Sequence, residues 1–182
     1  MPASIYQRLL GPDFDALPAP LRSFHAAKGQ HRFEGRYSAR GPTTRPAKLL
    51  ARLLGLPGPV EDQAFSFELS ADEQQEVWQR HFTGKTMRSC MRLQGGGLVE
   101  QLGPLRFHFT LAVQGPELVM LLQAVRLLGL LRCPRWLLPA IVAREKASSG
   151  RLHFDVEARM PGLGLLAAYS GHLEIPIPPG AG

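Results

Sequence analysis

Large apolar side chains occupy every second position from Leu105 to Val113, and this period of two constrains the fold more than any other feature. The pattern is typical of a strand with one buried face and one solvent face. Similar segments recur between tight glycine-containing turns, at residues 32–39, 65–69, 77–82, 86–93, 98–102, 141–146, 152–158 and 162–175. Short strands joined by such turns favour antiparallel pairing. We therefore expect a mainly β fold, a curved antiparallel meander or barrel of about eight to ten strands.

Helices are expected mainly in the first third of the chain. Residues 5–10 and 21–26 form short apolar segments bounded by glycine or proline, which are helix stop and start residues. Thr44 and Pro46 stand in the order expected for a hydroxyl cap followed by an early proline. The helix they open carries one apolar stripe, formed by Leu49, Leu50, Leu53 and Leu54. We expect it to be amphipathic.

The pattern of residues 117–131 fits a strand that extends to about Arg126, or alternatively an amphipathic helix with a basic edge. The strands on either side favour the first interpretation. Alternation then places Arg126 on the same inward face as Leu122. Because an unpaired guanidinium is costly in an apolar interior, we expect Arg126 to be at least half buried and paired with the carboxylate of Glu100 or Glu145.

The length of 182 residues suits one domain. We expect a single β-rich domain over residues 1–175 and a flexible tail over 176–182. The first residues show no charged region followed by an apolar one, which predicts a cytoplasmic protein. Cys90 and Cys133 lie far apart and fit no metal-binding or redox spacing, so they are expected to be reduced thiols.

Several motifs occur together in one order along the chain. They are Tyr6-Gln7-Arg8-Leu9-Leu10-Gly11, Leu21-Arg22-Ser23-Phe24-His25, Glu100-Gln101-Leu102-Gly103-Pro104-Leu105-Arg106-Phe107, Pro134-Arg135-Trp136-Leu137-Leu138-Pro139, Phe154-Asp155-Val156 and Tyr169-Ser170-Gly171. In this order the chain resembles, from Tyr6 to about Glu174, the bacterial family called domain of unknown function 4166. The resemblance carries no established activity and no catalytic residues. Family members often follow a part that looks like a nicotinamide-dependent oxidoreductase or epimerase, so the resemblance implies a companion module.

Charge and motif content argue against several function classes. The formal net charge is +6, which favours anionic partners through long-range attraction. The basic strand faces of Arg88, Arg92 and Arg106 lack interleaved aromatic residues, so we expect no nucleic-acid binding. No apolar run reaches the roughly 20 residues of a transmembrane helix. The sequence also shows no local metal-ligand spacing, phosphate loop or nucleophile motif, and we predict no cofactor and no metal.

The interior of the expected barrel supplies the candidate site. Phenylalanines and methionines suit loosely shaped apolar ligands such as acyl chains, and Arg126 would add a group for a ligand anion. The predicted ligand-binding residues are Trp78, Met87, Met91, Phe107, Phe109, Arg126, Trp136 and Phe154. No residue is assigned a catalytic role, although Glu100, Glu145 and Asp155 in apolar strands would support acid–base chemistry if they shared a dry pocket.

We therefore expect a non-catalytic module that encloses an apolar cavity for a hydrophobic or acyl-type small molecule. One alternative is a module that docks onto an oxidoreductase partner through an exposed apolar patch at residues 136–138 or on the leucine-rich helix. Another is an enzyme whose site combines His108, His153, Asp155 and Arg126. The sequence predicts neither the identity of the ligand nor the oligomeric state.

Overall fold

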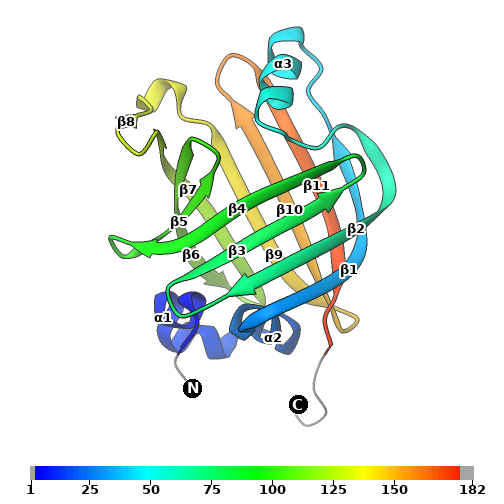
Figure 1. Ribbon diagram of the computed structural model, residues 1–182, viewed down its shortest axis with the longest axis vertical. Coiled ribbons are helices and arrows are strands. Elements are labelled where there is room, and N and C mark those ends of the chain that lie inside the picture. Colours follow the sequence, from blue (N-terminus) through cyan, green and yellow to red (C-terminus); the bar gives the residue numbers. More distant parts are fainter. Residues whose placement is uncertain (1–2, 177–182) are drawn as a thin grey trace.

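Ten antiparallel strands pair in a closed ring in the computed structural model, which describes residues 3–176 (Figure 1). The two-residue strand β8 (Leu131–Arg132) pairs only with β7. The ring consists of β1 (Gly29–Arg40), β2 (Val60–Ala71), β3 (Gln75–Phe82), β4 (Lys85–Gln94), β5 (Gly97–Leu102), β6 (Leu105–Gln114), β7 (Glu117–Leu127), β9 (Ala140–Ser148), β10 (Arg151–Met160) and β11 (Gly164–Glu174). The expected mainly β barrel with short N-terminal helices is confirmed.

The first and last strands close the ring by pairing with each other. Tyr37 on β1 lies opposite Gly171 on β11. The backbones approach so closely that a Cβ atom at Gly171 would lie 2.1 Å from the carbonyl oxygen of Arg36, and one at Gly35 would lie 1.8 Å from that of His172. Glycine is therefore required at both positions, because it has no Cβ.

Three short helical segments close one end of the barrel: α1 (Ile5–Leu10), the 3₁₀ helix η1 (Gly11–Ala16) and α2 (Ala19–Ala26) (Figure 1). Ser4 caps α1 through a reciprocal pair of hydrogen bonds with Gln7, as in the capping box. Their apolar side chains enter the barrel, and Tyr6, Leu17 and Phe24 are all buried. These segments form the base of the core.

The helix α3 (Arg45–Leu53) lies over the opposite end (Figure 1). The predicted helix is present, but its leucines do not form one buried face. Ala47 and Ala51 are its buried residues, whereas Leu49 and Leu53 are exposed. The helix thus rests on its smallest side chains, which allow it to lie close to the sheet, and directs two leucines away from the core.

The segment from Glu117 to Leu127 is a strand, as favoured by the sequence, but the predicted burial of Arg126 is wrong. A bulge explains the difference: His108 on β6 pairs with Ala124, while the next residue, Phe109, pairs with Leu122. Gln123 is the additional residue, and it reverses the phase of the strand beyond it. Val125 consequently faces the core and Arg126 faces solvent.

No helix among the described residues is both long and apolar enough to cross a membrane. Cys90 and Cys133 are free thiols. Of the expected flexible tail, residues 177–182 lie outside the described residues.

Candidate ligand-binding site

A cavity of about 120 Å³ lies within the barrel. Aromatic and aliphatic side chains from nine strands surround it. Five of the predicted ligand-binding residues line it: Trp78, Met87, Phe107, Phe109 and Phe154. Phe67 and Tyr169 also line it, and the cavity is smaller than the roughly 300 Å³ at the lower end of ligand pockets. By itself it matches a small aromatic ring more closely than a long chain.

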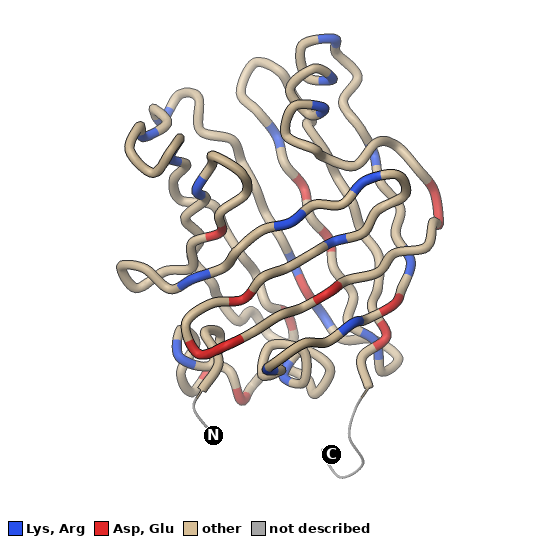
Figure 2. Tube along the Cα trace, in the orientation of Figure 1, with Lys and Arg blue, Asp and Glu red and all other residues tan. Residues whose placement is uncertain are grey.

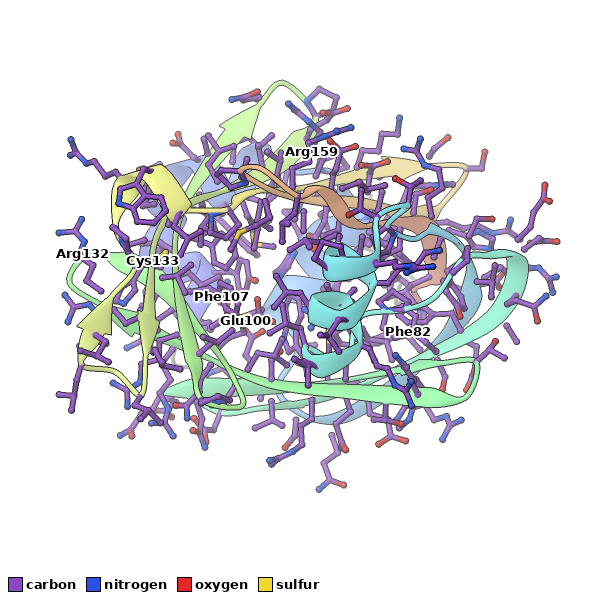
Figure 3. All side chains as sticks on the ribbon, turned by 90° about the horizontal axis from the view of Figure 1, so that it is seen from above. Phe82, Glu100, Phe107, Arg132, Cys133 and Arg159 are labelled. Atoms are coloured by element: carbon purple, nitrogen blue, oxygen red, sulfur yellow. The ribbon has the colours of Figure 1, made fainter. Side chains whose placement is uncertain are left out.

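An apolar groove of about 420 Å³ adjoins the cavity, between α3 and the segment from β7 to β9. The two volumes share five lining residues: Leu56, Leu102, Phe107, Ile141 and Ala158. We call this groove the mouth. Its walls also include Leu50 of α3, Leu54 directly after that helix, and Leu137 of the 3₁₀ helix η2 (Arg135–Leu137). Figure 3 looks into the barrel from this end, with Phe107 and Glu100 inside the ring and Arg132 at its periphery.

A buried ion pair lies on the cavity wall. Arg80 on β3 donates hydrogen bonds from Nη1 to Glu100 Oε1 and to Ser89 Oγ, both at 3.2 Å. Its guanidinium lies 4.8 Å from the ring centre of Trp78, a cation–π contact. Both hydrogen bonds come from one nitrogen, so the N–H donors of Nε and Nη2 have no hydrogen-bond partner among the described residues.

A second polar cluster lies at the base, where α2 meets the barrel wall. His25 Nε2 lies 2.6 Å from Glu145 Oε2, and the imidazole packs against the ring of Tyr6. Glu76 accepts a hydrogen bond from Trp78 Nε1 at 2.9 Å. Burial raises the pKa of Glu76 from 4.5 to about 7, although the neighbouring His25 and the Trp78 hydrogen bond act to lower it. A carboxyl group in this range is protonated or ionised according to small changes near neutral pH.

Three of the predicted ligand-binding residues do not line the cavity. Met91 is fully buried in the core outside the cavity lining. Trp136 on η2 is 76% exposed beside the mouth. Arg126 faces solvent, as described above, so neither Glu100 nor Glu145 is its partner. Both carboxylates are interior groups, but their partners are Arg80 and His25.

The proposed enzymatic combination of His108, His153, Asp155 and Arg126 is not assembled. His153 and Asp155 face an outer polar groove of about 530 Å³. His108 lies on β6 instead, where burial first, and then the charges of Arg126, Arg106 and Arg132, lower its pKa. Within residues 3–176, no group of three or more His, Cys, Asp or Glu side chains is arranged to hold a metal ion.

The sequence contained a pattern that identifies two interior charges that were not predicted. Glu76 and Arg80 alternate in phase with Trp78 and Phe82, and all four side chains are buried on β3. Trp78 and Phe82 mark the inward face of this strand. The period of two extends that face to Glu76 and Arg80, which is the signal that places both charges inside.

Residues 17–173 match the model of one protein family, described as Domain of unknown function (DUF4166). A search of curated proteins finds no match. Among solved structures, the crystal structure of Rv2717c from M. tuberculosis is similar, with a TM-score of 0.44 and 13% sequence identity. The similarity covers 88% of this chain and 99% of that chain.

Proposed function

Because the chain belongs to the family described as Domain of unknown function (DUF4166), which supplies no activity, we propose a function from its interior: the barrel binds an apolar, acyl-type ligand that enters through the mouth. The observation that carries this proposal is that the inner cavity and the apolar mouth lie side by side and share five lining residues. A ligand that occupies both would bury its apolar surface against leucine and phenylalanine side chains. Such burial contributes about 25 cal/mol for each Å² removed from water.

The interior charges favour a neutral head group at the inner end of this ligand. The charged side chains on the cavity wall are Arg80, Glu100 and Glu145. They include one cation and two carboxylates, and the cation already pairs with Glu100. A ligand carboxylate would therefore add a further negative charge in a poorly solvated space, which is unfavourable. A hydroxyl or carbonyl oxygen requires only the N–H donors that Arg80 keeps.

Trp78 provides a direct measurement of binding, because it lines the cavity and Trp136 is the only other tryptophan. In a Trp136→Phe background, we expect decanol to change the fluorescence of Trp78 in a saturable manner. Decanoate, which has the same chain with an anionic head, should bind at least tenfold more weakly. Equal affinity for both would contradict the neutral head group, and no saturable response to either would overturn the binding function.

A pair of substitutions separates binding in the barrel from adhesion to its surface. Ala158 lines both the cavity and the mouth, so Ala158→Phe should block the connection and weaken decanol binding. Ala140, on the neighbouring strand, is exposed, and Ala140→Phe adds the same side chain outside the barrel. We expect this control to bind as the parent does. If Ala158→Phe does not fold, Leu102→Phe narrows the same passage, because Leu102 also lines both volumes.

A role beside a nicotinamide-dependent oxidoreductase and a cytoplasmic location stay predictions from the sequence and its resemblance. Co-purification of a reductase with the full chain from its own host would support the first.

A further inference from the structure

Exposed apolar side chains are concentrated around the mouth. Of the eight large ones among the described residues, seven belong to α3 or to residues 127–139. Six of these are between 61% and 83% exposed, and we call them the apolar rim: Leu49, Leu53, Leu128, Leu130, Leu131 and Trp136. Apolar side chains gathered on one surface mark a site of contact with an apolar phase or a partner.

The same two segments are basic and contain no acidic residue. Residues 41–60 and 118–144 lack Asp and Glu entirely. Arg144 pairs with Glu117, whereas six other cations of these segments have no acidic partner among the described residues. We call these six the basic rim: Arg45, Lys48, Arg52, Arg126, Arg132 and Arg135. Figure 2 shows basic positions on α3 and around β8, the two sides of the mouth.

Part of the basic rim is a row of like charges on the outer face of the sheet. Arg126 lies directly opposite Arg106 on β6 and opposite Arg132 on β8. Like charges in directly opposite positions repel one another. This arrangement is stabilised when an anionic surface lies against it.

We propose that the apolar rim and the basic rim together dock the mouth onto an anionic lipid bilayer. The leucines and Trp136 enter the boundary between head groups and acyl chains, where tryptophan and amphipathic surfaces are favourable. The arginines and Lys48 lie against the lipid phosphates, and each strengthens binding about fivefold near such a surface. A second copy of the chain is a poorer occupant, because two basic rims would face each other. This inference goes beyond ligand binding and does not depend on an occupied cavity.

Co-sedimentation of the full chain with vesicles tests the proposal. We expect binding to vesicles of phosphatidylcholine and phosphatidylglycerol in equal parts, little binding to pure phosphatidylcholine, and weakening by salt. Arg132→Gln/Arg135→Gln should weaken binding about thirtyfold. Leu130→Ser/Leu131→Ser should weaken it at least tenfold. Brominated acyl chains should quench Trp136 in wild type, and that quenching should disappear in Trp136→Phe.

Matched substitutions away from the rim provide the control. Arg88 and Lys146 are exposed cations on the barrel wall, so Arg88→Gln/Lys146→Gln changes the net charge equally and should leave vesicle binding nearly unchanged. Leu121→Ser serves in the same way for the leucines. Equal losses in rim and control variants, or no binding to the anionic vesicles, would overturn the proposal. A wild-type dimer that becomes monomeric in the leucine rim variant would also overturn it, since a second copy would then cover the rim.

Discussion

Glu145 Oε2 on β9 lies 2.6 Å from His25 Nε2 on α2, and this buried contact connects the barrel wall to the helices that close its base. The other imidazole nitrogen, Nδ1, has no hydrogen-bond partner among the described residues. The contact with Glu145 is therefore the single hydrogen bond that satisfies this ring.

Glu145→Ala should destabilise the fold by about 3 kcal/mol, because it leaves a buried imidazole without a partner. His25→Ala should cost at least as much, since it also removes packing against Tyr6. The double variant should lose less than the sum of the two, with a coupling of about 1 to 3 kcal/mol. Urea denaturation of the four proteins measures this, and additive losses would show that the two groups do not interact.

The raised pKa of Glu76 predicts a loss of stability as the pH rises. Below pH 4.5 the carboxyl group is protonated in both the folded and the unfolded chain. Between pH 4.5 and about 7 the unfolded chain releases the proton while the folded chain keeps it. The free energy of unfolding therefore falls across this window by an amount on the order of 3 kcal/mol, and above it this contribution stays constant.

Glu76→Gln tests this dependence, because an amide oxygen still accepts the hydrogen bond from Trp78 but does not titrate. Its stability relative to wild type should increase as pH rises from 4.5 to about 7. Glu73 is exposed, so Glu73→Gln should show no such trend. The measurement is the free energy of unfolding of both proteins at the two ends of this pH window. If the difference in stability between Glu76→Gln and wild type is the same at both ends, Glu76 ionises normally.

Arg80 and Glu100 should behave as a buried pair, in contrast to the exposed Arg126. Arg80→Leu leaves Glu100 unpaired in the interior and should cost about 3 to 5 kcal/mol. Arg80→Leu/Glu100→Leu removes both charges and should recover most of that loss. Arg126→Ala should change stability by less than about 0.5 kcal/mol. Equal effects of Arg80→Leu and Arg126→Ala on the unfolding midpoint would contradict the assignment of the buried cation.

Gly171→Ala should prevent normal closure of the barrel, because the added methyl group would lie 2.1 Å from a backbone oxygen of β1. The neighbouring strand cannot move without breaking its hydrogen bonds, so we expect a loss above about 4 kcal/mol or failure to fold. Gly58 has no atom within 4 Å of an added Cβ and no positive φ. Gly58→Ala should therefore be neutral or slightly stabilising in thermal unfolding. Similar melting temperatures for Gly171→Ala and Gly58→Ala would contradict the close approach of the β1 and β11 backbones.

The strand pattern could be predicted from the sequence because alternation is a local property of each strand. Residues Leu105 to Val113 show this most clearly. Because the same alternation recurs in many other segments of the chain, the mainly β fold class could be predicted. The phase of β7 could not be predicted in the same way. The bulge at Gln123 exists only relative to the partner strand β6, which has one residue fewer at this point. Residues 117–127 alone do not indicate that one of them is unpaired.

The lining of the cavity was predicted in part for a related reason. Aromatic residues on inward faces, such as Phe107 and Trp78, line the cavity. Their inward direction could be predicted, because it follows from the alternation of each strand. The partners of Glu100 and Glu145 depend instead on which strands and helices meet. Arg80 is 20 residues from Glu100 and His25 is 120 from Glu145. Such pairings require the closed ring and its helical base.

In the described part of the chain, α1, η1 and α2 cover one end of the barrel, and the mouth lies at the other end, so we expect a ligand to enter and leave there. A bound molecule would then leave through the mouth by which it entered. A second molecule could enter only after the first had left. A barrel of this kind would suit the binding and release of one molecule at a time rather than continuous transport. The rate of exchange would then be governed by the motions of α3 and of the segment from β8 to η2, which flank that passage.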